Sequence, residues 1–257
     1  MRLMLREIYA LSDTGPVRTQ NEDMYLAAGN LGREDRFEVS VADDQPLLVA
    51  VADGMGGHPD GEIASRRALE LLDEARSNNL LPDQASEHAD FTHILSGIHD
   101  NLVGGADSGH ALKMGATMVG LWLPPGEPPM WFHAGDSRLY RWRDNVLEQL
   151  TNDHTMVNEM LRSGRDPGGV SPHIVTSCLG GGMFKPTVDT ASASGPIQPE
   201  DRFLLCSDGL TEAVSDQQIL SILGSGTAQE SAEALVQAAL TGDARDNITV
   251  VVVRVTE

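Results

Sequence analysis

Four aspartates occupy the same kind of position in this chain, at the junction between an apolar strand and a turn that contains Gly or Asn. They are Asp23 in RTQNED, Asp53 in VAVADGMGG, Asp208 in LLCSDG and Asp246 in ARDNITVVVV. A carboxylate at the end of a buried strand is held in direction by the sheet, and several converging ends form a rigid, oxygen-rich pocket for hard cations. The recurrence therefore predicts a metal centre.

Such a pocket is unfavourable without cations, because two like charges about 4 Å apart repel by about 4 kcal/mol at an effective dielectric constant of about 20. Bound metal ions should therefore stabilise the fold. Gly54 follows Asp53 and has no side chain, so its carbonyl oxygen can approach an ion closely. One such aspartate alone is typical of a turn or a helix cap, and it is the set of four that favours the metal centre.

The elements that would position these residues alternate in blocks of strands and helices. Apolar runs predict strands at residues 3–11, 23–28, 37–42, 47–52, 116–123, 130–134, 138–142, 202–206 and 248–255. Helical spacing predicts helices at residues 61–76, 89–102, 155–162, 216–223 and 229–240. This order indicates a layered α+β fold with mainly antiparallel sheets.

The helix expected at residues 61–76 should cover a sheet with one apolar face. Its buried side chains are predicted to be Ile63, Ala64, Ala68, Leu71, Leu72 and Ala75. The glycine- and proline-rich residues 164–172 should form a surface loop.

Length and composition place further limits on the chain. Its 257 residues, of which 40% are hydrophobic and 22% are charged, fit a single domain over residues 1–257. A formal net charge of −20 argues against nucleic acid or an anionic membrane as partner. The apolar runs are too short to span a bilayer, and charged residues interrupt the N-terminal segment where a secretion signal needs an apolar core. We therefore expect a cytoplasmic protein without a membrane anchor.

Seven motifs of the sequence resemble, in the same order, those of bacterial type 2C protein phosphatases of the PPM family. They are RTQNED, VADGMGGHPDGEIAS, GATMVG, HAGDSRLYR, LTNDHT, CSDGLTEAV and RDNITVVVV, and the resemblance covers residues 12–255. It implies a four-layer α-β-β-α sandwich, with two packed antiparallel sheets flanked by helix pairs. It also implies a metal-dependent phosphatase that hydrolyses phosphoserine or phosphothreonine on proteins.

The resemblance further implies a binuclear manganese or magnesium centre. In that centre Asp53 would bridge both ions, the Gly54 carbonyl, Asp208 and Asp246 would be further ligands, Asp23 would act nearby, partly through water, and Asp136 of GDSR would help hold a third ion. A metal-bound water would supply hydroxide at neutral pH and attack phosphorus in line, without a phosphoenzyme.

Two residues are candidates for contact with the substrate itself. Arg18 matches the family position whose guanidinium binds two phosphate oxygens. His58 is the candidate general acid for the leaving oxygen. Many eukaryotic relatives have their histidine directly after the Asp-Gly pair, where this chain has Met55, so a loop histidine without a role is an equal alternative. His154 in TNDHT is expected to cap or pack rather than to catalyse.

Other motif residues are expected to support the site. Glu22 and Asn247 are supporting residues, and Asn247 should orient Asp246 or a nearby loop. Thr117 and Ser137 are expected in packing and loop support. Residues 155–178 correspond to the variable flap beside the family's active site, which should shape substrate choice.

The sequence does not support two other phosphoryl-transfer mechanisms. A cysteine-based phosphatase needs Arg six positions after its Cys, but Glu212 follows Cys206 and Phe184 follows Cys178 at that spacing. No P-loop is present. Two alternatives remain open: a catalytically silent relative that binds phosphoproteins, and a phosphatase dedicated to one regulatory partner. We expect a monomeric enzyme that opposes a bacterial Ser/Thr kinase, acting on its targets or on the kinase itself.

Overall fold

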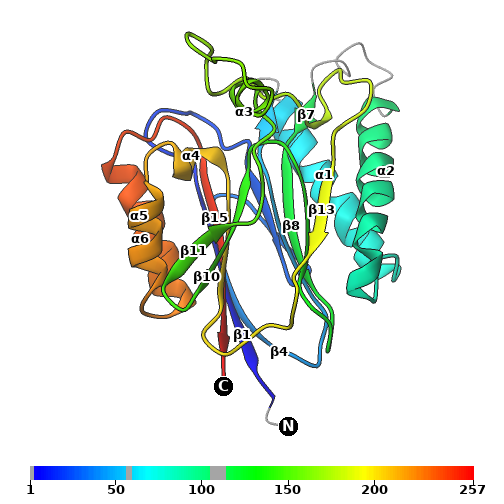
Figure 1. The fold of residues 1–257 in the computed structure, drawn as a ribbon, viewed down its shortest axis with the longest axis vertical. Coiled ribbons are helices and arrows are strands. Elements are labelled where there is room, and N and C mark those ends of the chain that lie inside the picture. Colours follow the sequence, from blue (N-terminus) through cyan, green and yellow to red (C-terminus); the bar gives the residue numbers. More distant parts are fainter. Residues whose placement is uncertain (1–2, 56–59, 105–113) are drawn as a thin grey trace.

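Two six-stranded antiparallel sheets lie face to face in the computed structural model, which describes residues 3–55, 60–104 and 114–257 (Figure 1). The first sheet has the order β11 (Val146–Gln149), β10 (Arg138–Arg143), β14 (Arg202–Cys206), β15 (Ile248–Thr256), β1 (Leu5–Asp13), β4 (Arg36–Ala42). The second has the order β13 (Asp189–Ser192), β9 (Met130–Ala134), β8 (Met118–Leu123), β5 (Leu47–Ala52), β2 (Met24–Ala27), β3 (Asn30–Gly32).

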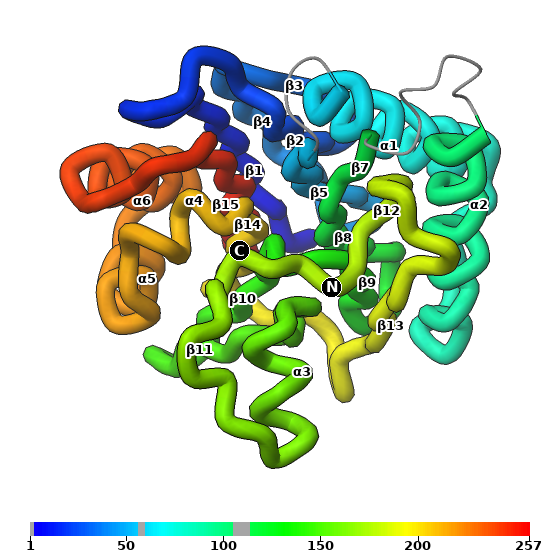
Figure 2. Tube along the Cα trace, turned by 90° about the horizontal axis from the view of Figure 1, so that it is seen from above, coloured from blue at the N-terminus to red at the C-terminus, as the bar shows by residue number. Residues whose placement is uncertain are grey.

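Helices cover the outer face of each sheet, on opposite sides of the molecule (Figure 2). The second sheet packs against α1 (Asp60–Ser77), α2 (Phe91–Gly104) and the 3-10 helix η1 (Ala85–Asp90), and the first packs against α5 (Asp216–Leu223) and α6 (Ala228–Thr241). A third apolar cluster, including Ile8, Val49 and Val251, fills the space between the sheets. The predicted four-layer sandwich is thus confirmed. Within the described residues, no helix has the length and apolar character needed to cross a membrane.

The central strands and the capped helices follow directly from their sequences. All six residues of β5 are buried, as expected for a strand covered on both faces. Helix α6 begins at a capping box, in which the Thr227 side chain accepts a bond from the Glu230 amide and the Glu230 side chain accepts one from the Thr227 amide. The apolar run thus accounts for the position of β5, and the capping box accounts for the start of α6.

Some sequence expectations were wrong in detail. Ile63 is 49% exposed, although it was expected on the buried face of α1. Ala64, Ala68 and Leu72 recur every four residues and define that face. Ile63 lies about 100° around the helix from Ala64, because an α-helix has about 3.6 residues per turn. The second helix begins at Phe91, after a 3-10 turn.

Short elements at the end of the sandwich that carries α4 (Asp208–Thr211) were not expected. A three-stranded sheet has the order β12 (Leu179–Gly180), β7 (Gly115–Ala116), β6 (Gly54–Met55), with two residues in each strand. Helix α3 (Met156–Arg162) and the segment after it lie at the same end, opposite both termini (Figure 1).

A buried arginine links the two large sheets. Arg6 on β1 is 1% exposed, and its guanidinium donates to the Leu123 carbonyl of β8 at 3.2 Å and to the Val41 carbonyl of β4 at 3.4 Å. It also donates to the carbonyls of Ala42 and Gln45. Burial lowers the pKa of Arg6 to about 10, opposed by the nearby acidic residues 43 and 44. Arg6 therefore provides hydrogen bonds to backbone carbonyls near strand ends of both sheets at once.

Arg6→Met should lower the free energy of unfolding by about 3 kcal/mol or more, because a buried carbonyl left without its donor costs about 1–3 kcal/mol. Urea unfolding at pH 7 measures the change. Arg36→Met is the matched control, because the Arg36 side chain on β4 is 73% exposed. A substitution at such a surface position should change stability by no more than about 0.5 kcal/mol. Equal effects of the two substitutions would contradict this role of Arg6.

Candidate metal centre

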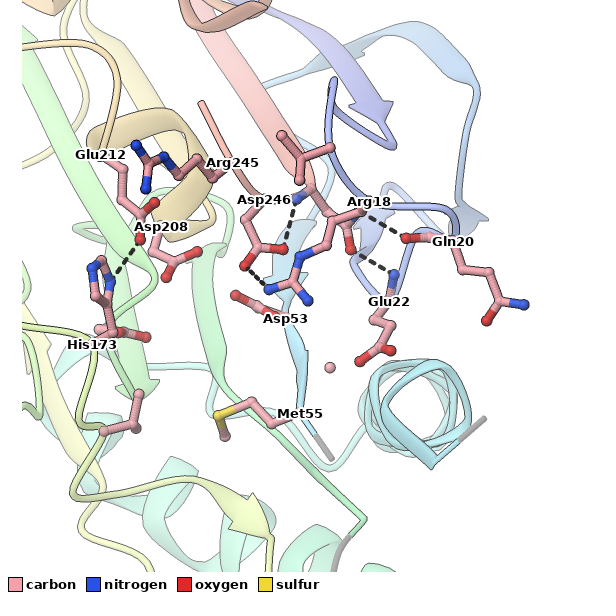
Figure 3. Close-up of a pocket in the computed structure, with 15 residues that line it drawn as sticks. Arg18, Gln20, Glu22, Asp53, Met55, His173, Asp208, Glu212, Arg245 and Asp246 are labelled. Atoms are coloured by element: carbon pink, nitrogen blue, oxygen red, sulfur yellow. Dashed lines mark hydrogen bonds and ion pairs between the residues drawn. The ribbon is translucent and has the colours of Figure 1, made fainter. Parts of the chain in front are cut away.

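The predicted carboxylates converge on one cavity of about 650 Å³ at the end of the sandwich that carries α4. Figure 3 shows Asp53, Asp208 and Asp246 directed into this cavity, with Arg18 beside Asp246. Further predicted site residues that line it are Glu22, Gly54, Asp136 and Asn247. The structure thus brings these residues together from segments far apart in sequence. His58, the predicted general acid, lies outside the described residues.

Asp53 is held at the end of β5 by the neighbouring strand. Its amide donates to the Thr117 hydroxyl at 3.2 Å, and the Thr117 amide donates to the Asp53 carbonyl at 2.9 Å. The Thr117 hydroxyl also pairs with that of Ser137 at 2.8 Å, next to Asp136. The supporting contacts expected of Thr117 and Ser137 are therefore present, and they join the two loops that carry Asp53 and Asp136.

Gly54 lies where a side chain could not fit. A Cβ atom at this position would lie 2.1 Å from the Gly61 carbonyl oxygen and 2.7 Å from the Glu22 carbonyl oxygen. The loop before β2, the strand β6 and the start of α1 can approach one another only because residue 54 is glycine.

Asp23 is 1% exposed and is held by a serine that the sequence analysis did not single out. The Ser207 hydroxyl donates to Asp23 Oδ2 at 2.6 Å and accepts from the Thr249 amide at 3.0 Å. Ser207 directly precedes Asp208, so the same short segment contacts Asp23 and supplies a neighbouring carboxylate. Only the folded structure brings residues 23 and 207 together.

The pKa values of the carboxyl groups in and beside the cavity are strongly raised. Burial, followed by the charges of Asp23, Asp208 and Asp136, raises the pKa of Asp53 well above its usual value. Burial, followed by the charge of Asp136, does the same to the pKa of Asp208. Burial also raises the pKa values of Asp23 and Asp136 to about 6, although the hydrogen bond from Ser207 acts against the rise at Asp23. Ionising this cluster is therefore costly unless cations neutralise it.

The residues of the cavity fit divalent cations. Oδ1 of Asp208 is buried without a hydrogen-bond partner among the described residues. The carboxylates and the Gly54 backbone that line the cavity provide oxygen donors, which Mg²⁺ and Mn²⁺ prefer. A bound metal ion would give the unpartnered oxygen a ligand bond and would neutralise part of the clustered negative charge.

Asn247 holds the loop that carries Arg18. Its side-chain amide donates to the carbonyls of Thr14 at 2.8 Å and Gln20 at 2.9 Å, and its side-chain oxygen accepts from the Glu22 amide at 2.8 Å. The Arg18 guanidinium contacts the Asp246 carboxylate at 2.5 Å, and that bond raises the pKa of Arg18. Half of the Arg18 side chain, 51%, remains exposed toward solvent.

Four further polar residues line the cavity, and the sequence analysis did not assign them to the site. They are Gln20, His173, Glu212 and Arg245. Glu212 follows Asp208 by four residues, a spacing that places both on one side of a helical turn, and this was the one sequence signal available. His173 belongs to the segment 155–178 and is distant in sequence from the other site residues.

A pair of stacked histidines lies outside this cavity, and its hydrogen bonds do not suit a metal ion. The His133 and His154 rings stack at 4.4 Å near Asp189. His154 Nδ1 accepts from the Gly135 amide at 3.2 Å, and His133 Nε2 accepts from the Asn152 amide at 3.4 Å. A ligating histidine donates from its second nitrogen, so these acceptor bonds oppose metal binding. The packing expected of His154 agrees with its burial.

Comparison with known sequences gives one consistent result. Residues 27–242 match the family described as protein phosphatase 2C. The serine/threonine protein phosphatase PstP of Mycobacterium tuberculosis is 34% identical over 260 residues, which cover 96% of this chain and 45% of that protein. The serine/threonine phosphatase stp of Listeria monocytogenes is 33% identical over 250 residues, which cover 94% of this chain and 93% of that protein. This chain thus spans less than half the length of PstP.

Solved structures show the same similarity. A crystal structure of PstP from Mycobacterium tuberculosis superposes with a TM-score of 0.79 at 31% identity, covering 98% of this chain and 100% of that one. The catalytic domain of PstP in complex with two manganese ions superposes with a TM-score of 0.78 at 32% identity, covering 99% and 100%.

Asp208→Asn should stabilise the protein in EDTA at pH 7, because it removes a carboxyl whose ionisation is opposed by burial and by the charge of Asp136. Added Mn²⁺ should raise the melting temperature of the intact chain and raise that of the variant much less. Differential scanning calorimetry measures both effects. Asp100→Asn, at an exposed position of α2, is the control and should behave like the intact chain.

In EDTA the free energy of unfolding should fall as pH rises from about 4 to about 7. Asp23 and Asp136 have pKa values of about 6 in the fold against the ordinary 3.8, so their stabilising contribution is complete below pH 3.8 and is lost through pH 6. A shift of two units corresponds to roughly 3 kcal/mol per carboxyl. Urea titrations at several pH values test this, and Asp23→Asn should flatten the profile. An unchanged profile in that variant would contradict the assignment.

Proposed function

The chain belongs to the protein phosphatase 2C family, and from that premise we propose that it is a metal-dependent phosphatase acting on phosphoserine and phosphothreonine in proteins. The observation that carries the proposal is the convergence of Asp53, Asp208 and Asp246 with Arg18 in one open cavity. Carboxylates to hold cations and a guanidinium to bind phosphate are the groups that metal-assisted phosphate hydrolysis requires. This proposal treats residues 1–257 as one catalytic domain.

We assign two divalent cations, Mn²⁺ or Mg²⁺, to the cavity. Asp53, the Gly54 carbonyl, Asp208 and Asp246 would hold them, and Asp23 would act nearby, partly through water. A third ion would involve Asp136, which lines the same cavity. When bound, the ions would lower the pKa of a water molecule and make it a nucleophile at neutral pH.

Arg18 would bind two oxygens of the phosphate group. Its planar guanidinium suits that bidentate geometry, and the loop that carries it is tied to Asn247 by three hydrogen bonds. The bond to Asp246 orients the guanidinium over the carboxylates. The chain thus fixes the phosphate in place, so that little motion is needed before reaction.

The protein part of the substrate would lie along a second cavity, of about 550 Å³, that adjoins the first. Asp136, His173 and Glu212 line both cavities, and Thr155 and Asn158 from the segment 155–178 line the second. This segment, the flap, includes α3, and a bridge between Thr155 and Val175 pairs its first residues with its last part. In this proposal the flap contacts the residues around the phosphorylated side chain and shapes substrate choice.

The proposed partners are proteins phosphorylated by a Ser/Thr kinase, or that kinase itself. The proposed location is the cytoplasm, and the proposed oligomeric state is a monomer. The free cysteines Cys178 and Cys206 support a reducing compartment. The net charge of −20 disfavours nucleic acid as a partner.

The intact chain with Mn²⁺ should release phosphate from a phosphothreonine peptide, and release should stop when EDTA is in excess. Asp208→Asn should lower kcat by about a hundredfold or more, because it removes a cation ligand at the reacting centre. Malachite-green detection of phosphate measures both, with Asp100→Asn as the control. Failure of the folded, metal-loaded chain on several phosphopeptides and on an aryl phosphate would favour a silent phosphoprotein-binding relative.

Arg18→Lys should lower kcat/KM on the same peptide by about tenfold or more, because an ammonium group cannot bind two phosphate oxygens in a planar fork. The Mn²⁺-induced rise in melting temperature should persist, since Arg18 is not a metal ligand. Steady-state kinetics and calorimetry on the same samples separate the two effects. Loss of the calorimetric response together with activity would contradict the phosphate-binding role.

A further inference from the structure

The cavity contains one imidazole among its described lining residues, that of His173. Serine and threonine alkoxides are poor leaving groups, so their departure from phosphorus is aided by a proton donor. The carboxylates of the cavity are suited to cations, and a guanidinium does not release its proton near neutral pH. Met55, directly after Gly54, lines the cavity with a side chain that carries no transferable proton. Imidazole is the group that changes charge near neutral pH.

His173 is held in the cavity by a carboxylate. Its Nδ1 lies 2.7 Å from Oε1 of Glu212, which follows the last residue of α4. One nitrogen or oxygen atom from each of His173, Glu212 and Asp208 lies within 4.8 Å of the other two. Figure 3 shows the imidazole beside Asp208, on the opposite side of the carboxylates from Arg18. The flap thus brings its histidine to the part of the cavity where Asp208 lies.

The pair has the arrangement of a carboxylate-supported acid. When Nδ1–H donates to Glu212, the carboxylate fixes the orientation of the ring. Nε2–H is then available as a donor. The His173 side chain is 58% exposed and that of Glu212 is 24% exposed, so solvent can return a proton to the ring after each turnover.

We propose that His173 is the general acid of the reaction and that Glu212 is its positioning residue. This inference rests on the function proposed above. In the step, the attacking water gives up one proton to solvent and its oxygen forms a bond to phosphorus, while the bond from phosphorus to the serine or threonine oxygen breaks. The electron pair of the broken bond stays on that oxygen, which takes the proton from His173 Nε2. His173 is then reprotonated by solvent.

A flap anchor is the competing role for this pair, and the two roles predict different results. An anchor that only holds the flap would affect the hydrolysis of all bound phosphate esters alike or change KM. A general acid matters most when the leaving oxygen is strongly basic, as in phosphothreonine. It matters least when the leaving group is a stable phenolate, as in p-nitrophenyl phosphate.

The test compares His173→Gln, Glu212→Gln and His58→Gln on a phosphothreonine peptide and on p-nitrophenyl phosphate, with saturating Mn²⁺. His173→Gln should lower kcat on the peptide by about a hundredfold, within the range for a general acid, and its loss on the aryl phosphate should be at least about tenfold smaller. Glu212→Gln should show the same selectivity with a loss of about tenfold. His93→Gln, at an exposed position of α2, is the matched control and should lose nothing on either substrate.

Each other outcome overturns the inference. Equal losses on both substrates would assign His173 to flap anchoring, and a selective loss in His58→Gln but not in His173→Gln would assign the acid to His58. A reduced Mn²⁺-induced melting shift in His173→Gln would assign the residue to metal binding. The intact chain separates the two proposals: if it hydrolyses neither substrate, the proposed function fails as well, whereas every other outcome leaves that function in place. His173→Asn should reproduce the selective loss.

Discussion

The mutual repulsion of buried carboxylates is the constraint on which this structure depends. Asp23, Asp53 and Asp208 lie in surroundings that oppose their ionisation, yet the chain places them at one end of the sandwich. An arrangement of this kind is costly unless cations offset the repulsion. The scaffold must therefore be stable enough to hold the carboxylates in place, and the ends of strands in a packed sandwich provide that rigidity.

The sandwich tolerates the acidic end because other contacts hold the sheets together. Ile8, Val49 and Val251 belong to the apolar cluster between the sheets, which carries no charge. At the other end of β1 from the cavity, Arg6 supplies hydrogen bonds to carbonyls of both sheets. The apolar packing between the sheets and the hydrogen bonds of Arg6 stabilise the sandwich away from the carboxylates. The acidic end therefore does not have to contribute to the stability of the fold.

Sequence reasoning was most successful where one local signal determines the outcome. Asp53 could be placed at a strand end because β5 is an uninterrupted apolar run, and α6 could be placed by its period. Ile63 was misplaced because an apolar residue at the edge of a helical face satisfies the pattern about as well as a buried one. The contacts of Ser207 with Asp23, and of His173 with Glu212, join distant segments, and no local pattern carries that information. Strands of two residues give no measurable periodicity.

Helix α4 lies between the carboxylates of the cavity and the flap, and its close packing holds the residues at both of its ends in place. Asp208 begins the helix and Glu212 follows it. Gly209 packs so closely on the start of β15 that a Cβ there would lie 2.1 Å from the Asn247 carbonyl oxygen. The helix is therefore fixed against the strand, with Asp208 and Glu212 at set positions. The His173 side chain is more than half exposed, and its contact with Glu212 is what ties this part of the flap to the fixed position of α4.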